Sequence, residues 1–324
     1  MLRPLLKAVL FFSLLLVPHF LSAQKDSSAV TQAPHKDTVK VGVFITSIYA
    51  LGFAENDFGI DFWVWYQFKD TTIDPLATTE IVNSESRSVD FATRENKGNM
   101  IWATHKCSAM IKKNWEIERF PLDGQTLNVL LEETDMDTSQ LVYVADTANS
   151  KIDKSVELNG WKISDFRLTP SVYTYNTTYG DPTLQGNSSY ARLTISTRIE
   201  RESKNIFLKL FLGLYVAFLI ALSVFFLDGA EIGARTSLAV GALFASVGNK
   251  YIVDSSLPDH SSFTIVDKIH DATFALILIS IVFSIISNGI VRKGDHKKAK
   301  RFDIACFIFM VISYLLTHYF IISK

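Results

Sequence analysis

The sequence predicts an all-β sandwich extracellular domain followed by an all-α four-helix transmembrane domain. All five Trp lie before residue 162, among short segments in which apolar and polar residues alternate, whereas long apolar runs occur at the N-terminus and after residue 205. Alternation with a period of two is typical of half-buried strands, and an apolar run of about 20 residues can cross a bilayer. The length of 324 residues fits two domains, and a net charge of −1 indicates no nucleic-acid partner.

Residues 1–23 have the features of a secretory signal peptide. Arg3 and Lys7 give a positive start, an apolar stretch follows, and small residues precede Gln24. An uncleaved anchor helix is the alternative interpretation, but the apolar stretch is short and a proline interrupts it. Residues 24–39 are polar and are predicted to form a linker.

Residues 40–202 are predicted to form the β-sandwich. The clearest strand is 58–68, where apolar side chains alternate with Gly, Asp, Trp and Gln. Further strands are expected at 41–45, 102–111, 126–131, 141–145, 161–168 and 191–200. Turn-type residues such as Asn159-Gly160 separate them. Many short strands at a spacing of roughly ten residues are typical of a sandwich, and no long helices alternate with them as in an α/β enzyme.

The sequence contains no catalytic constellation. Cys107 and Cys306 lie in different halves, so neither a disulfide framework nor a cysteine metal cluster is available. His105 has no Cys or second His nearby, so a strand or surface histidine is a better interpretation than a metal ligand. There is no Gly-rich phosphate loop, no G-x-S-x-G and no nucleophile–base pair. We therefore expect no enzyme activity, no metal and no cofactor.

Two polar clusters in the predicted sandwich have alternative interpretations. One is an acidic turn formed by Glu132-Glu133 and Asp135 to Asp137, which either binds Ca²⁺ or another cation or is a solvated loop. The other surrounds a loop rich in Gly, Asn and Ser and consists of Tyr173, Tyr175, Tyr179 and Tyr190. These rings either close over a ligand, with faces that attract cations, or pack as ordinary strand residues.

Residues 203–324 are predicted to form a four-helix transmembrane pore domain, with spans at about 205–227, 235–256, 264–286 and 304–322. Residues 291–301 carry six Lys and Arg between the last two spans, so the positive-inside rule places this loop in the cytoplasm. A cleaved signal and four spans then put the N-terminal domain and the C-terminus on the periplasmic side of a bacterial inner membrane.

The second predicted span has mixed polarity. Small or hydroxylated residues and one bulky ring recur at steps of three and four, which places them on one helical face: Ser237, Gly241, Phe244, Gly248, Ile252 and Ser255. A helix at membrane depth with such a stripe requires water or protein along it. We expect this face to line a pore made by several copies of the chain. Gly241 and Gly248 either widen the pore beside Phe244 or let a neighbouring helix pack closely.

Several motifs occur in a specific order. Residues 120–125 read Phe-Pro-Leu-Asp-Gly-Gln, Arg201 lies twelve residues before Gly213, and residues 256–258 read Ser-Leu-Pro. With these motifs the chain, from about residue 41 to the C-terminus, resembles the pentameric ligand-gated ion channels of the Cys-loop receptor superfamily. It is most similar to the prokaryotic members without the Cys-loop disulfide, because Lys113 and Leu127 stand where animal members have cysteines. Gly213 departs from the family pattern, which has proline there.

The resemblance implies a homopentamer in which a small-molecule or ionic agonist binds between subunits of the sandwich ring. The implied agonist-binding residues are Trp102, Glu132, Tyr173, Tyr175 and Tyr190. The implied coupling residues at the junction of the two domains are Glu55, Pro121, Asp123, Arg201 and Pro258. Two departures matter: the acidic position of the first junction loop falls on Phe53, and the family's loop-B aromatic is missing from 132–135. A full aromatic cage for a quaternary amine is therefore not expected.

A ring of Phe244 side chains would close the pore by excluding water. At the two pore mouths, Glu231 and Asp254 favour cations. Arg235 and Lys250 either face away from the pathway or oppose cations, and no acidic residue immediately precedes Arg235. We therefore expect cation-leaning selectivity, with membrane lipid and permeant ions as further partners. The alternative function is a non-conducting pentameric membrane receptor or binding module.

Overall fold

The computed structural model describes residues 36–180, 182, 186–255, 257 and 262–323. The predicted signal peptide, the predicted linker up to His35, and Ser256 and Pro258 of the linker motif lie outside these residues. The remaining part of the predicted linker is not all coil, because β1 begins at Asp37.

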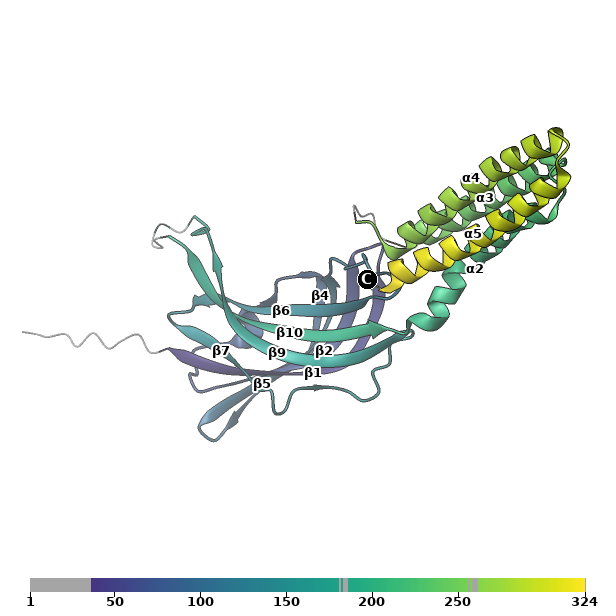
Figure 1. Cartoon of the computed structure of the whole chain (residues 1–324). Coiled ribbons are helices and arrows are strands. Elements are labelled where there is room, and N and C mark those ends of the chain that lie inside the picture. Colours follow the sequence, from purple (N-terminus) through teal and green to yellow (C-terminus); the bar gives the residue numbers. More distant parts are fainter. Residues whose placement is uncertain (1–35, 181, 183–185, 256, 258–261, 324) are drawn as a thin grey trace, which may run out of the picture. The chain divides into compact units, whose positions relative to one another are not determined.

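Two β-sheets form the N-terminal part of the described chain (Figure 1). The first has the order β4-β5-β2-β1-β7, with β8 paired to β1, and contains β1 (Asp37–Gly52), β2 (Asp57–Phe68), β4 (Ser84–Lys97), β5 (Met100–Lys112), β7 (Leu141–Ala145) and β8 (Lys151–Ile152). The second has the order β3-β6-β10-β9 and contains β3 (Thr79–Ile81), β6 (Gly124–Asp137), β9 (Trp161–Tyr175) and β10 (Ser188–Arg201). A single-turn helix, α1 (Pro75–Thr78), precedes β3.

Residues from both sheets share one apolar core, which gives a sandwich-like layering. Alternate side chains of β1 and β2 point into it, including Val41, Val43, Phe58 and Phe62, all fully buried. From the second sheet, Leu193 and other alternate residues of β10 and β6 complete the core. The alternation seen in the sequence therefore marks the faces that pack together.

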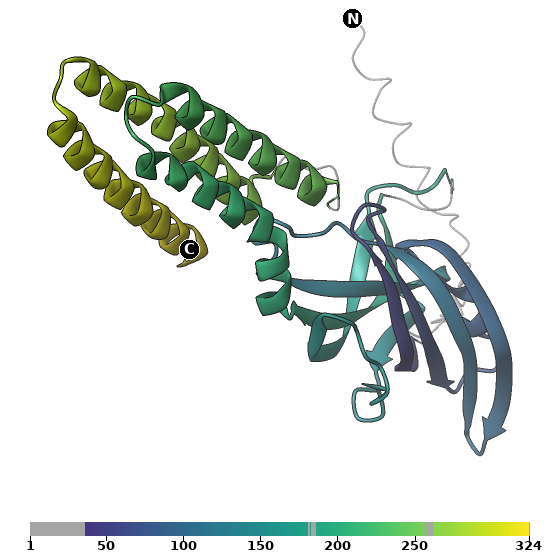
Figure 2. The same ribbon diagram turned by 90° about the vertical axis from the view of Figure 1, so that its right-hand side faces the viewer.

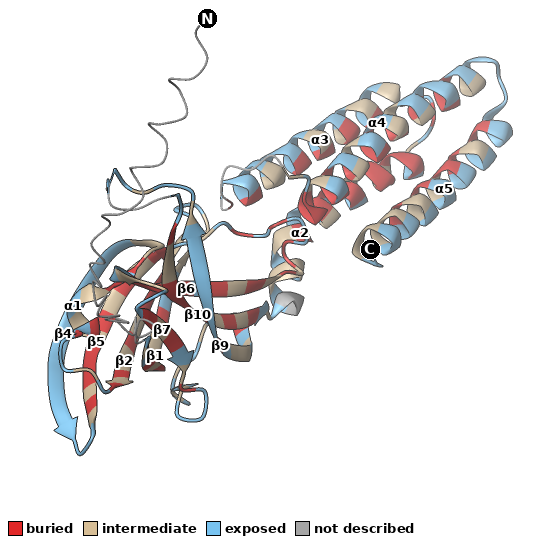
Figure 3. Cartoon of the chain, turned by 90° about the vertical axis from the view of Figure 1, so that its left-hand side faces the viewer, coloured by how far each residue is buried: buried red, intermediate tan, exposed pale blue. Residues whose placement is uncertain are grey.

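Strand β4 was not expected from the sequence. After Ser84 its side chains are all exposed, as the pale colour along the strand shows (Figure 3). It is held by an antiparallel ladder to β5 at the edge of the sheet. Because neither face is buried, the strand has no apolar–polar alternation that would reveal it.

Four helices follow the strands and lie side by side (Figure 2). They are α2 (Ser203–Ser223), which continues into the 3-10 turn η1 (Val224–Phe226), α3 (Ile232–Asp254), α4 (Ile265–Arg292) and α5 (His296–Ser323). Three segments of the described chain are long and apolar enough to cross a membrane: Asn205–Phe226, Ile265–Arg292 and His296–Ser323. The order of strands and then helices is thus confirmed. Helix α3 exists but is less apolar, so a fourth span remains a prediction.

Helices α4 and α5 are longer than the predicted spans. The basic run expected as a loop is mostly helical, and Lys293–Asp295 alone connect the two helices. Lys, Arg and Ala are strong helix formers, and the positive φ of +85° at Gly294 ends α4. At its other end, α4 begins with a capping box in which Thr264 and Asp267 bond each other's backbone N–H.

Candidate functional site

One face of α3 is exposed along its whole length in the single chain. Five of the six predicted pore-lining residues lie on it, with Phe244 73% and Ile252 66% exposed, and the sixth, Ser255, is the exposed residue that caps the helix. The opposite face, which includes Ala239, Ala242 and Ser246, is buried against the other helices (Figure 3). A Cβ at Gly241 or Gly248 would meet open space, so no described residue packs there. The stripe is thus free for water or for another copy of the chain.

Arg235 does not belong to this stripe. It is fully buried, and its Nη1 and Nη2 donate to Oδ1 and Oδ2 of Asp303 on α5 at 3.0 and 2.6 Å. Nη2 also donates to the carbonyl of Leu227 at 2.5 Å. Of the two alternatives that the sequence left open for Arg235, the structure favours the one in which it faces away from the stripe. Glu231, at the start of α3, is exposed.

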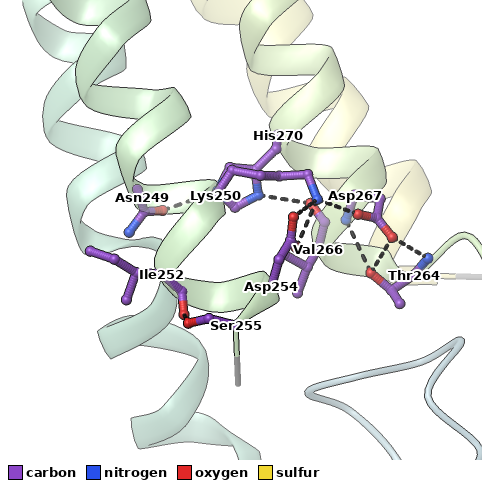
Figure 4. A network of polar contacts seen from close by, with 9 residues as sticks. All are labelled: Asn249, Lys250, Ile252, Asp254, Ser255, Thr264, Val266, Asp267 and His270. Carbon is purple, nitrogen blue, oxygen red and sulfur yellow. Dashed lines mark hydrogen bonds and ion pairs between the residues drawn. The ribbon is translucent and has the colours of Figure 1, made fainter. Parts of the chain in front are cut away.

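Lys250 is also paired with carboxylates, one on α3 itself and one on α4. Its Nζ lies 2.8 Å from the Asp254 carboxylate and 2.5 Å from Oδ1 of Asp267 on α4 (Figure 4). One of the two predicted pore-mouth carboxylates, Asp254, is therefore paired with a cation of its own chain.

A histidine joins α3 to α4 beside this ion pair (Figure 4). His270 is fully buried, with Nδ1 2.8 Å from the carbonyl of Val266 and Nε2 3.0 Å from Oδ1 of Asn249. The Asn249 amide is orientated by its Nδ2, which donates to the carbonyl of Leu210 on α2 at 3.2 Å. Gly213 lies against this amide, and a Cβ there would be 3.1 Å from Nδ2. Both ring nitrogens thus face oxygen acceptors. Neutral imidazole has one N–H and can donate to only one of them, whereas imidazolium has two N–H groups and can donate to both.

The junction motif contains a buried, ring-lined ion pair. Arg201, at the end of β10, donates from Nε and Nη2 to the Asp123 carboxylate at 2.7 and 3.2 Å. Its guanidinium lies 4.0 Å from the centre of the Trp161 ring and 4.9 Å from the rings of Phe53 and Phe120. An arginine held by a bidentate carboxylate and aromatic faces is fixed in place.

Two other predicted coupling residues, Pro121 and Glu55, belong to the described chain. Pro121 is buried, whereas Glu55 is exposed in the turn between β1 and β2 and makes no ion pair with Arg201 in the described chain. Phe53 instead contacts Arg201. The connection between β5 and β6, which contains Pro121 and Asp123, reaches α4, because the N–H of Ile265 donates to the carbonyl of Glu118 at 3.1 Å.

A cavity of about 400 Å³ opens beside the tyrosine cluster of the sandwich. The Tyr175 hydroxyl donates to Oε1 of Glu132 at 2.6 Å, and Nε of Arg192 donates to Oε2 of the same carboxylate at 2.6 Å. Arg192 also lies 3.7 Å over the ring of Tyr173. Burial, reinforced by the Glu132 charge, raises the pKa of Tyr175 well above its usual range. The cavity lining includes Glu80, Glu132, Glu133, Tyr179 and Tyr190. Its three carboxylates face one nearby cation, Arg192.

Of the two interpretations of the acidic segment, a solvated loop does not hold for Glu132 and Glu133, whereas Asp135 is exposed. Glu132 and Glu133 are 3% and 1% exposed in β6, and Glu133 accepts hydrogen bonds from Thr78 and Tyr143. No group of three or more metal-ligating side chains occurs in the described residues. Trp102 lies on β5 of the other sheet, near Lys97, and is not brought together with the tyrosines within one chain.

These features resemble one class of protein, the prokaryotic pentameric ligand-gated ion channels, and a comparison with known proteins confirms the resemblance. The chain is similar to the proton-gated ion channel of Gloeobacter violaceus, with 23% identity over 241 residues that cover 68% of this chain. The match spans 64% of the length of that relative. No protein-family model matches the chain.

Proposed function

We propose that the chain is a subunit of a homopentameric ligand-gated ion channel in a bacterial inner membrane, with α3 as the fourth span and the lining of a central pore. The observation that carries this proposal is the exposed stripe of α3. Phe244 and Ile252 leave large apolar surfaces uncovered in one chain, and assembly around an axis would place them along a shared pathway. At its narrowest ring, Phe244 would exclude water and close the pore.

The withdrawal of Arg235 supports cation selectivity. With its guanidinium bound to Asp303, Arg235 adds no positive ring to the pore mouth, whereas the exposed Glu231 adds a negative one. Lys250 likewise lies within its ion pair with Asp254 and Asp267. The remaining charge along the stripe is therefore negative, which raises the local concentration of cations.

We infer that protons are the activating ligand. The similar protein from Gloeobacter violaceus is a proton-gated ion channel. In this chain, His270 has oxygen acceptors at both ring nitrogens, so a second ring proton lets the ring donate to Val266 on α4 and to Asn249 on α3 at the same time. The Glu132–Tyr175–Arg192 cavity is a second place where protonation or a small cation would change the contacts, through the predicted agonist site.

Reconstitution in planar bilayers tests this function. We expect discrete currents after a step from pH 7.5 to pH 5, with a reversal potential in asymmetric NaCl that favours Na⁺. His270→Gln keeps one donor and one acceptor but cannot take up a proton, so its activation curve should shift to lower pH. His296→Gln, an exposed histidine on α5, is the matched control and should leave the curve unchanged.

Two outcomes would contradict the proposal. Pentamers that carry no current under pH steps and small amines would favour the non-conducting receptor. A pH response that is the same in His270→Gln and in the unaltered protein would remove the proton role of His270 but would leave the channel function in place.

A further inference from the structure

The turn that connects η1 to α3 is held by the last two turns of α4. Asn288 on α4 is 8% exposed, and its Nδ2 donates to the carbonyl of Gly229 at 2.8 Å. The same nitrogen lies 3.5 Å from the carbonyl of Ala230. Because a side-chain amide has two N–H groups, Asn288 can hold two consecutive carbonyls of this turn.

The turn packs so closely against α4 that it leaves no room for a side chain at Gly229. Gly229 is buried, and a Cβ there would lie 2.8 Å from Oγ of Ser287 and 2.9 Å from Cγ2 of Val291. A larger residue would therefore push the turn away from α4. A hydrogen bond and a close contact thus fix the same turn.

The turn ends at Glu231, the exposed acid at the start of α3. The N–H of Ala230 donates to Oδ1 of Asp228 at 2.8 Å, and the N–H of Glu231 donates to the Asp228 carbonyl at 3.0 Å. The carbonyl of Glu231 accepts the N–H of Arg235 at 3.1 Å and so begins the helix. Since these bonds close the turn within a few residues, a displacement at Gly229 also displaces Glu231.

We propose that Asn288 is a positioning residue for the pore mouth: it holds the turn against α4 and thereby sets where the Glu231 carboxylates stand around the pathway. This role rests on the proposed function, because it requires Glu231 to face a shared pore. Electrostatic attraction falls with distance, so carboxylates held close to the axis concentrate cations more than carboxylates that have moved outward. Asn288 lies on α4 and acts through the turn rather than on the ions directly.

Single-channel recording in planar bilayers tests this role. Asn288→Leu has a similar volume but no donor, so the turn loses its hydrogen bond. We expect the conductance to fall about twofold and the reversal potential in asymmetric NaCl to shift toward that of chloride, with pentamers and the pH of half-activation unchanged. Gly229→Ala keeps the Asn288 amide but displaces the turn, and should have the same two effects.

A mutant cycle with Glu231→Gln separates positioning from general damage. Once the Glu231 charge is removed, Asn288→Leu should change neither conductance nor reversal potential further. Ser287→Ala removes a buried hydroxyl that has no hydrogen-bond partner among the described residues, so it is the neighbouring control and should leave both quantities unchanged. Adding Ser287→Ala and Val291→Ala to Gly229→Ala removes both atoms that the new Cβ would meet and should restore them.

Unaltered conductance and reversal potential in Asn288→Leu would overturn the proposal, and so would equal losses with and without the Glu231 charge. A measurement without current separates it from the proposed function. Nitroxides attached at Glu231→Cys report distances between subunits of a pentamer, and both native cysteines are buried. Asn288→Leu should shift these distances. Unchanged distances would refute the positioning role, whereas absence of current in the unaltered protein would refute the channel function alone.

Discussion

Replacing Asp303 with Asn tests the buried ion pair that holds α3 to α5. Arg235 is 0% exposed, and Asp303 supplies two of the three hydrogen bonds that its guanidinium makes, at 3.0 and 2.6 Å. Removing one partner of a buried pair costs about 3–5 kcal/mol, because the other charge stays buried. Asn keeps one acceptor oxygen, so we expect a cost near the lower limit, about 3 kcal/mol per chain.

That cost is large enough to change where Arg235 lies. A difference of about 1.4 kcal/mol changes an equilibrium tenfold, so about 3 kcal/mol shifts the preference for the buried position by about two orders of magnitude. The Arg235 guanidinium is then more stable when it is hydrated at the end of α3, near Glu231. We expect two results: a melting temperature lower by several degrees, and a reversal potential in asymmetric NaCl that moves toward that of chloride.

Controls separate stability from charge. Asp295→Asn removes an exposed carboxylate three residues before Lys298, whose N–H it accepts, and should change neither quantity. The double variant Arg235→Met with Asp303→Leu removes both charges, so it should recover much of the stability and keep cation selectivity. A reversal potential that stays at the unaltered value in Asp303→Asn, despite a lower melting temperature, would refute the link between this pair and ion selectivity.

Three further predictions follow from the described contacts. Phe244→Ala should produce a resting current in bilayers without agonist, because the widest side chain of the stripe is lost; a silent resting state would move the gate elsewhere. Asp123→Asn should leave pentamers intact in size-exclusion chromatography but sharply reduce evoked current, since Arg201 loses its bidentate carboxylate; unaltered currents would count against a coupling role. Burial, with the Arg87 charge nearby, lowers the pKa of His105 to about 4. Between about pH 6.5 and pH 4 the unfolded chain therefore binds a proton at His105 that the folded chain does not. The melting temperature should therefore decrease as the pH is lowered through this range, and it should decrease less in His105→Gln.

The sequence predicted those elements whose two faces differ. The residues of β2 alternate between apolar and polar because one face of the strand enters the core. The stripe of α3 is visible because its residue types differ from those on the buried face of the helix. Strand β4 was missed because it is exposed on both faces and has no such contrast.

Long-range partners were harder to predict than elements. Arg235 and Asp303 are 68 positions apart, so the sequence left the direction of Arg235 open. A signal existed, because Arg235 falls within the predicted span 235–256, and a charge at membrane depth requires a partner. Arg192 was also missed, although it completes the Glu132–Tyr175 contact, because a charged residue in a strand usually faces solvent.

The three-residue connection from Lys293 to Asp295 limits how the subunits exchange parts. Three residues reach only about 10 Å even when fully extended. With the turn at Gly294 in place, helix α5 returns along α4 of its own chain, which it contacts. Each subunit can thus complete its helical hairpin during synthesis, before it meets another copy.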